Sequence, residues 1–161
     1  MLIEDRLAAL GLHLPPPMQP PPGVILPFSP VRVVGDRAYV SGHGPQNEDG
    51  TFGGPYGKVD GDVSVDEGYQ AARTAALSIL GSLKRELGDL DRVTAWLRVF
   101  GMVSSSPGFQ RQPSVINGFS DLIIELYGPA GAHARSAVGL AELPFGIPVE
   151  IEAEVQISVA R

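Results

Sequence analysis

The C-terminal segment of the chain carries a row of acidic side chains. Residues 149–159 alternate between apolar and polar types, and Glu150, Glu152 and Glu154 fall on the polar positions. Successive side chains on a strand point to opposite faces, so these carboxylates are expected to share one face. A second predicted strand, just upstream, carries Arg135. If the two strands are neighbours, a guanidinium and several carboxylates lie close together and can hold a small charged substrate and a water molecule.

Arg135 and Glu150 have the clearest chemical potential of these residues. A planar guanidinium can bind a carboxylate through two charge-assisted hydrogen bonds. The alternative for Arg135 is an ion pair with a glutamate of the acidic row, and residue types alone favour it. Glu150 can act as a general acid and base, a role worth about 10²–10⁴-fold in rate, and partial burial would raise its pKa to suit this task. The alternative, an exposed strand glutamate, suits Glu154 better, while Glu152 is suited to a supporting or interface ion pair.

Other reactive groups do not form a familiar site. The chain has no cysteine, which excludes disulfides, thiolate metal sites and cysteine nucleophiles. Its three histidines lack metal-ligand spacing, and no phosphate-binding loop or Gly-x-Ser-x-Gly motif is present. We therefore expect no metal and no cofactor. The histidines are His13, His43 and His133, and His43 is predicted to be a solvated loop residue.

Composition favours an ordinary globular domain. With 161 residues, 43% hydrophobic and 19% charged, one domain with a sizeable core is expected. The net charge of −6 and the scattered arginines and lysines disfavour nucleic-acid binding. No apolar run is long enough for a membrane span, and the first residues do not resemble a signal peptide, so a cytoplasmic location is expected.

The first half of the chain has a helix, a proline-rich connector and a hairpin. A short helix over residues 2–10 is predicted to stop at Gly11, and two Pro-Pro-Pro runs then form a strap that ends at residue 22. We therefore divide the chain into an N-terminal segment (1–22) and a main domain (23–161). Residues 31–34 and 37–41 predict a β-hairpin. The Gly-rich segment 42–61 is predicted to be a loop, with a short strand near residues 56–59.

The second half alternates helices with strands. Ser64 and Glu67 have capping-box spacing and open a predicted helix that Gly88 ends. Pro113 begins a second helix, which ends at Gly128. The predicted strands here cover residues 93–100, 134–144 and 149–159. The chain is thus predicted to form a two-layer α+β domain with a six-stranded mixed sheet and two helices on one face. The other sheet face then needs cover, which oligomerisation can provide.

The motifs around Arg135-Ser136-Ala137, Leu143-Pro144 and residues 149–153 resemble the RidA/YjgF family, also called liver perchloric-acid-soluble protein or endoribonuclease L-PSP. The resemblance runs from about Pro27 to the C-terminus. Residues 26–29 look like the family's Gly-Pro-Tyr-Ser, and residues 38–42 look like its Ser-Gly strand end. Asn117, Arg135 and Glu150 fall where the family has its helix asparagine, its carboxylate-binding arginine and its acid.

The resemblance implies a chorismate-mutase-like fold without mutase activity, assembled as a homotrimer with three clefts between subunits. It also implies hydrolysis of reactive 2-imino acids, or their enamine tautomers, to 2-keto acids and ammonia. The implied binding partner is therefore a small-molecule carboxylate substrate. The residues implied are the catalytic pair Arg135 and Glu150 and a substrate-binding set of Phe28, Ser41, Gly42, Asn117, Arg135 and Ala137.

Each member of the substrate-binding set also has a purely structural interpretation. Ser41 and Asn117 can hydrogen-bond the substrate or water, or they can be a strand-end turn and a helix-surface amide. Gly42 can let a backbone N–H approach a ligand, or can simply end a strand. Phe28 can line the cleft or belong to the core.

The chain departs from the family pattern at several positions. Phe28 replaces the family's tyrosine, Ala137 replaces its frequent cysteine, and the loop 128–133 is longer than in compact members. These changes leave open a non-catalytic protein that binds a small metabolite in the same cleft. A ribonuclease, as one family name implies, is disfavoured by the acidic charge.

Overall fold

One mixed sheet of five strands forms the centre of the structure, a computed structural model that describes residues 2–159. The spatial order is β1-β2-β5-β3-β4, and only the β3–β4 pair is parallel. The strands are β1 (Val31–Val34), β2 (Arg37–His43), β3 (Val93–Ser104), β4 (Ala134–Leu140) and β5 (Val149–Ile157).

The sixth strand predicted near residues 56–59 is not present among the described residues. Val59 makes only isolated bridges, to Val63 and Ser105. Gly57 has φ of +116° and Asp60 has φ of +68°, so the chain turns on either side of Val59 instead of extending. The prediction of a short strand here was wrong because a four-residue segment that includes Gly57 and Lys58 does not distinguish a strand from a sequence of turns.

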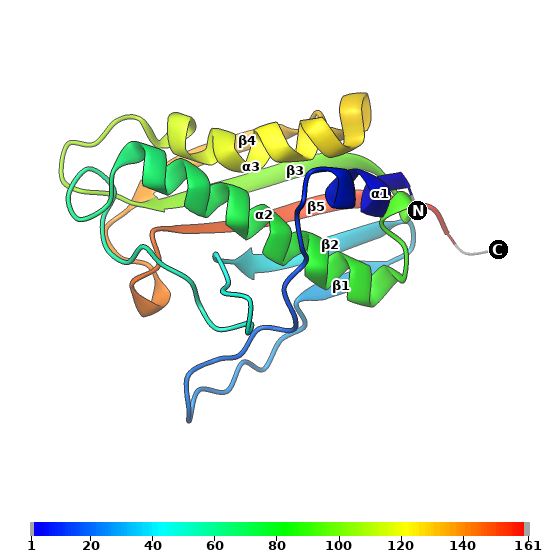
Figure 1. The fold of residues 1–161 in the computed structure, drawn as a ribbon, viewed down its shortest axis with the longest axis horizontal. Coiled ribbons are helices and arrows are strands. Elements are labelled where there is room, and N and C mark those ends of the chain that lie inside the picture. Colours follow the sequence, from blue (N-terminus) through cyan, green and yellow to red (C-terminus); the bar gives the residue numbers. More distant parts are fainter. Residues whose placement is uncertain (1, 160–161) are drawn as a thin grey trace.

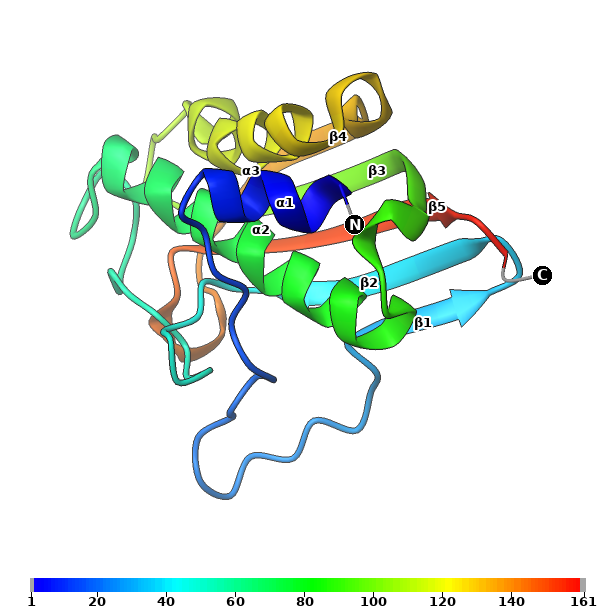
Figure 2. The same ribbon diagram turned by 45° about the vertical axis from the view of Figure 1, so that its right-hand side comes forward.

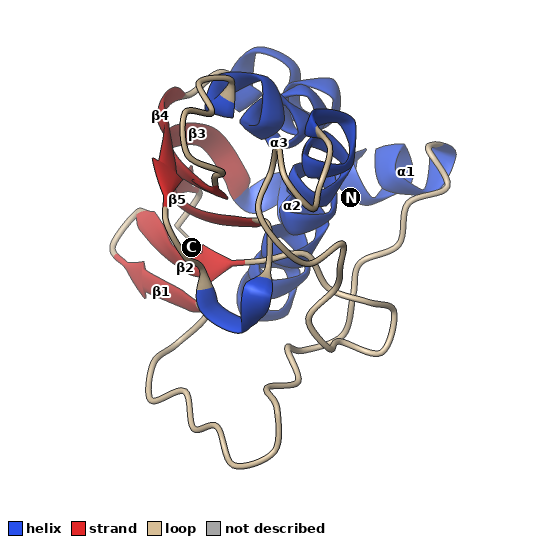
Figure 3. Ribbon diagram, turned by 90° about the vertical axis from the view of Figure 1, so that its left-hand side faces the viewer, coloured by secondary structure: helices blue, strands red, loops and turns tan. Residues whose placement is uncertain are grey.

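Helices cover one face of this sheet. Helices α2 (Val65–Leu87) and α3 (Gln112–Tyr127) run side by side over the strands, and the shorter α1 (Leu2–Ala9) lies beside them (Figure 1). The view along the layers shows the strands on one side and the helices on the other, and among the described residues no α-helix covers the second sheet face (Figure 3). The two-layer α+β architecture is therefore confirmed, but with three α-helices on that face where two were predicted. Three short 3₁₀ helices complete the elements: η1 (Leu90–Arg92), η2 (Gly128–Gly131) and η3 (Pro144–Gly146).

The alternation of the C-terminal strand matches these two layers. In β5, Val149, Ile151 and Val155 are fully buried beneath the helices. The intervening Glu152 is exposed and Glu150 is half-buried, both on the uncovered face. The prediction of an acidic face on this strand is confirmed.

Local capping signals set the ends of the two long helices. The Ser64 side chain accepts a hydrogen bond from the backbone N–H of Glu67, and the Glu67 carboxylate accepts one from the backbone of Ser64. Gly88 ends α2 in the left-handed conformation, with φ of +79°. Pro113 occupies the first turn of α3, where its missing N–H costs nothing.

Two glycines let α3 approach its neighbours closely. A Cβ on Gly118 would lie 1.9 Å from the carbonyl oxygen of Tyr69 in α2. A Cβ on Gly101 of β3 would lie 2.7 Å from the side chain of Ile116. Helix α3 therefore rests almost directly on the backbone of α2 and on β3, which sets its position relative to both elements.

The N-terminal segment packs on the same core. Ile3 and Leu7 of α1 are buried, and the Glu4 carboxylate accepts a hydrogen bond of 2.6 Å from Lys84 of α2. Arg85 of α2 donates to the carbonyl of Pro15, which ties down the start of the proline-rich strap. Gln19 then pairs with Gly50 and Thr51, and the connector between Gln19 and β1 projects away from both layers (Figure 2). Within the described part of the chain, no helix has both the length and the apolar character needed to cross a bilayer.

Candidate functional site

Arg135 lies on the edge strand β4, beneath helix α3. Its guanidinium donates to the hydroxyl of Ser120 at 2.9 Å, to the amide oxygen of Asn117 at 2.8 Å and to the carbonyl of Pro113 at 3.2 Å. All three acceptors are neutral and belong to α3. Among residues 2–159, no salt bridge involves Arg135, so the predicted alternative of an ion pair with the acidic row of β5 does not form within one chain.

A histidine extends this network. The Ser120 hydroxyl lies 2.9 Å from Nε2 of His133, and Nδ1 of His133 lies 2.7 Å from the carbonyl oxygen of Gly131. Burial lowers the pKa of His133, and the positive charge of Arg135 lowers it further. We call Asn117, Ser120, His133 and Arg135 the edge cluster.

Glu150 lies on the uncovered face of β5, against the bulged end of β2. A Cβ on Gly42 would lie 2.9 Å from Oε1 of Glu150, so the absence of a side chain at Gly42 makes room for this carboxylate. Burial raises the pKa of Glu150, and the neighbouring charge of Glu152 raises it further. No hydrogen bond to the Glu150 side chain is present within the described residues.

Ser41 and Phe28 mark the junction between the projecting connector and β2. The Ser41 hydroxyl donates to the carbonyl of Ser29 at 2.7 Å, and its backbone N–H donates to the carbonyl of Pro30. Phe28 is 51% exposed, so the interpretation of this residue as part of the core is wrong. We call Ser41, Gly42 and Glu150 the strand-end cluster.

Within one chain the two clusters face away from each other. The strands β4 and β5 were expected to be neighbours, but β3 lies between them. Arg135 is in register with Val99 of β3, which is fully buried under the helices, whereas Glu150 is in register with Met102, on the uncovered face. The expectation of a guanidinium and a carboxylate meeting on adjacent strands is therefore incorrect for a single chain. Ala137 follows Arg135 on the helix-covered face, two residues along β4.

The uncovered face is hollowed between β2, β3 and β5. The hollow has a volume of about 260 Å³ and includes Ser41 at its margin. Its lining carries side chains of both charges and two aromatic rings, from Arg32, Tyr39, Arg98, Phe100, Glu152 and Glu154. Such a surface can meet a complementary charged surface or a small polar ligand.

His43 has a different environment from the one predicted. It is the last residue of β2 and only 1% exposed, with Nε2 2.9 Å from the hydroxyl of Ser82 and Nδ1 2.6 Å from the carbonyl of Ser41. Burial lowers its pKa. The prediction of a solvated loop histidine was wrong because the Gly-rich sequence after Ser41 gave no sign that β2 continues under α2.

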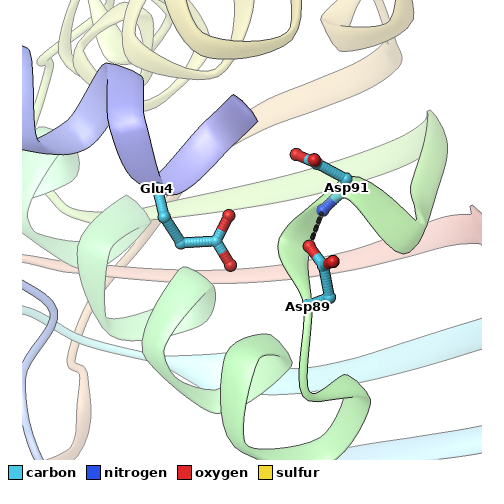
Figure 4. A group of neighbouring side chains, drawn as sticks. All are labelled: Glu4, Asp89 and Asp91. Carbon is cyan, nitrogen blue, oxygen red and sulfur yellow. Dashed lines mark hydrogen bonds between the residues drawn. The ribbon is translucent and has the colours of Figure 1, made fainter. Parts of the chain in front are cut away.

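One group of carboxylates is close enough to suggest a cation site. Glu4, Asp89 and Asp91 approach one another at the start of α1 (Figure 4). Glu4, however, already accepts from Lys84 and from the backbone of Leu90. Asp91 accepts from the backbone N–H groups of Leu2 and Ile3. These carboxylates thus satisfy helix ends and an ammonium group, which is sufficient to explain their proximity.

Sequence reasoning missed Ser120 and His133. Ser120 lies one helical turn after Asn117, so the two side chains share one face of α3, and this spacing was a usable signal. His133 comes just before the edge strand, two residues ahead of Arg135, but its contact with Ser120 depends on how η2 returns the chain beneath α3. Sequence spacing alone does not reveal that contact.

Comparisons with known proteins cover the edge cluster and most of the strand-end cluster, although the family model ends before Glu150. Residues 4–146 match the family model described as "YjgF/chorismate_mutase-like, putative endoribonuclease". The match begins well before residue 27, where the resemblance was expected to start. Protein TCP17 of Trypanosoma cruzi is 39% identical over 157 residues, which cover 97% of this chain and 94% of TCP17.

Solved structures are likewise similar to this chain over nearly its whole length. Atu1372 of Agrobacterium tumefaciens is 40% identical, with 98% of this chain and 93% of that chain covered and a TM-score of 0.87. A Shewanella oneidensis MR-1 protein described as "a putative endoribonuclease" is 28% identical, with a TM-score of 0.89. The match covers 98% of this chain and 100% of that chain. Because the family model spans most of the chain and these relatives span nearly all of it, the chain belongs to the YjgF/chorismate mutase-like (RidA/L-PSP) family.

Proposed function

We propose that this protein is a cytoplasmic, cofactor-free hydrolase that converts 2-imino acids, or their enamine tautomers, to 2-keto acids and ammonia. The observation that carries this proposal is the state of Arg135. Its half-buried guanidinium is held by neutral oxygens, and no carboxylate of the described residues forms a salt bridge with it. Its charge is therefore available to the carboxylate of a small substrate.

The hydrogen bonds of Arg135 favour this role because they orient the guanidinium without neutralising it. They occupy three of the five N–H groups of an arginine. The remaining N–H groups can donate to a carboxylate, and partial burial strengthens such a charge-assisted bond. Family membership supports the same assignment, because Arg135 falls at the position of the family's carboxylate-binding arginine.

Glu150 is suited to the proton transfers of the reaction. Its carboxylate accepts a proton from water as the water oxygen bonds to the carbon of the protonated imine, which gives a neutral carbinolamine. The carboxyl group returns this proton to the nitrogen, and the carboxylate then takes the proton of the hydroxyl as the C–N bond breaks, so that ammonia leaves and the keto group forms. A pKa raised by burial and by Glu152 makes Glu150 a stronger base when ionised and a competent acid when protonated.

A second copy of the chain is part of this proposal. The edge cluster and the strand-end cluster lie on opposite faces of one sheet, so one chain alone does not bring Arg135 to Glu150. We propose a homotrimer in which the edge cluster of one subunit meets the strand-end cluster of the next. The charged hollow on the uncovered face and the exposed Phe28 are then available to the subunit interface or to the substrate.

The test is an imine-clearance assay. An upstream enzyme generates 2-iminobutanoate in the presence of the protein, and keto-acid formation is compared with spontaneous hydrolysis. We expect acceleration by the wild-type protein and its loss in both Arg135→Ala and Glu150→Gln. Arg37→Ala, which removes an exposed arginine from β2, and Glu48→Gln, which alters an exposed loop residue, serve as matched controls with full activity. Absence of acceleration, or full activity of Arg135→Ala, would reject the assignment.

A non-catalytic metabolite-binding protein is the second candidate. Phe28 and Ala137 occupy positions where the family carries a hydroxyl and a thiol, so two reactive or hydrogen-bonding groups are missing here. Calorimetry with 2-ketobutanoate separates the two functions: binding that Arg135→Ala abolishes, together with no imine clearance, would support the binding protein.

A further inference from the structure

A chain of hydrogen bonds connects Arg135 of β4 to α3 and to η2. It leads from the guanidinium to the Ser120 hydroxyl, from there to Nε2 of His133, and from Nδ1 of His133 to the carbonyl of Gly131. Ser120 is 8% exposed, and the rings of His133 and Phe119 pack edge to face. The chain is thus partly buried between α3 and η2.

The donors and acceptors of this chain fix its proton positions. Arg135 can only donate, so the Ser120 oxygen accepts from it. The Gly131 carbonyl can only accept, so Nδ1 of His133 carries a proton. In the neutral imidazole Nε2 is then an acceptor, and it takes the hydroxyl proton of Ser120. This arrangement directs a lone pair of Ser120 at the guanidinium.

The surroundings favour the neutral form of His133. Burial lowers its pKa, and the adjacent Arg135 lowers it further. The groups facing the ring are the Ser120 hydroxyl and Phe119 from α3, the Gly131 carbonyl from η2 and Arg135 from β4. The nearby carboxylate, Asp121, acts on Arg135 and accepts a hydrogen bond from the Tyr69 hydroxyl at 2.7 Å. Within the described residues, no salt bridge stabilises a charged His133.

We infer that Ser120 and His133 are positioning residues: neutral His133 directs the Ser120 hydroxyl so that its oxygen holds the Arg135 guanidinium in place for a substrate carboxylate. This inference rests on the proposed function for its ligand, a short 2-keto or 2-imino acid. The hydrogen-bond chain itself is independent of that function and can be tested without turnover.

The binding test uses pairs of variants. Ser120→Ala removes the acceptor of the guanidinium, and His133→Phe removes the acceptor of the serine proton. Each is expected to weaken 2-ketobutanoate binding and to raise the KM of imine clearance about tenfold, with kcat less affected, because a hydrogen bond to a charged group is lost. Ser120→Thr keeps the hydroxyl and His133→Gln keeps an acceptor, so both are expected to restore affinity. Ser114→Ala, on the exposed face of α3, is the control.

A spectroscopic test follows the imidazole directly. Nuclear magnetic resonance of ¹⁵N-labelled histidine is expected to show His133 neutral at pH 7, with the proton on Nδ1. Arg135→Gln removes the adjacent positive charge and is expected to raise the pKa of His133. Saturating 2-ketobutanoate is also expected to raise the pKa of His133, because the bound carboxylate offsets the positive charge of Arg135.

The outcomes separate the two proposals. If Arg135→Ala abolishes keto-acid binding while Ser120→Ala and His133→Phe leave it unchanged, the positioning inference is overturned and the proposed function stands. If 2-ketobutanoate neither binds nor shifts the His133 resonance, the proposed function fails; the expected tautomer and the Arg135→Gln shift would then still support the hydrogen-bond chain. A proton on Nε2 in the free protein contradicts the chain in either case.

Discussion

At the scale of single residues, Glu150 combines an unfavourable position with the chemistry that the proposal requires. Its carboxylate is half-buried next to Glu152, and no hydrogen bond to its side chain within residues 2–159 compensates for the lost hydration. A group in this state costs stability when it is ionised. Catalytic groups are often held in such environments, because the same desolvation tunes their pKa.

The sign of the effect gives a stability prediction for Glu150→Gln. The pKa of Glu150 is raised on folding, so its favourable contribution is fully present below the unfolded pKa and is lost as the pH rises through the folded value. At pH 7, and at dilutions at which the proposed assembly dissociates so that no neighbouring Arg135 offsets the Glu150 charge, the variant is therefore expected to unfold at a higher temperature than the wild type. The difference should shrink as the pH falls below the pKa values of both states. Thermal unfolding at several pH values measures it.

Glu48→Gln is the control for that experiment, because Glu48 is exposed in a loop. If Glu48→Gln raises the unfolding temperature by the same amount, the effect comes from the change in net charge and not from the burial of Glu150. If Glu150→Gln is less stable than the wild type at pH 7, burial of the ionised Glu150 carboxylate does not destabilise the fold. If the variant is more stable but inactive, the residue trades stability for function.

At the scale of elements, α3 carries the support for Arg135. Asn117, Ser120 and the carbonyl of Pro113 all come from this helix. The helix can reach its position only because Gly118 has no side chain to meet the backbone of α2. The packing of α2 on α3 therefore controls the geometry of the edge cluster.

Gly118→Ala tests this coupling. The added methyl would overlap the Tyr69 carbonyl, so α3 must shift, and overpacking of this kind costs about 1–3 kcal/mol. We expect a lower free energy of unfolding in urea and weaker 2-ketobutanoate binding in the fraction that remains folded. Ser114→Ala, on the same helix but exposed, should leave both quantities nearly unchanged. Wild-type stability in Gly118→Ala would show that the two helices separate without cost.

Helix ends were predictable from sequence, whereas strand order was not. Ser64 with Glu67, Gly88 and Pro113 act through hydrogen bonds and dihedral angles within a few residues, so their effects are visible locally. The parallel pairing of β3 with β4 agrees with the rule for strands joined through a helix. The placement of β5 between β2 and β3, however, depends on pairing between residues at least 46 positions apart.

At the scale of the whole molecule, the uncovered sheet face and the separation of the two clusters suggest the same assembly. The face carries a hollow of about 260 Å³ with charges of both signs, and the chain has a net charge of −6. The homotrimer that we propose would cover this face and would bring the edge cluster of one subunit to the strand-end cluster of another.

Subunit mixing tests this assembly directly. Arg135→Ala and Glu150→Gln are each expected to be inactive as homo-oligomers. When they are co-assembled in equal amounts, about a quarter of the clefts should combine an intact Arg135 with an intact Glu150 from different subunits, and imine clearance should return in proportion. Light scattering on the wild type establishes the oligomeric state. A monomeric protein, or no recovery of activity on mixing, would show that the two residues do not share a cleft between subunits.

The sequence by itself determined the period of each strand and helix, the helix caps and the residues that carry the family motif, including Arg135 and Glu150. These features depend on local dihedral angles, on local hydrogen bonds and on the side-chain alternation of a strand. Only the tertiary structure decided that β3 separates β4 from β5, so that Arg135 lies beneath α3 and Glu150 lies on the opposite face. It also decided that Ser120 and His133 support Arg135. The physical reason is that strand order and helix docking depend on which distant surfaces pack best, and residue spacing along the chain does not contain that information.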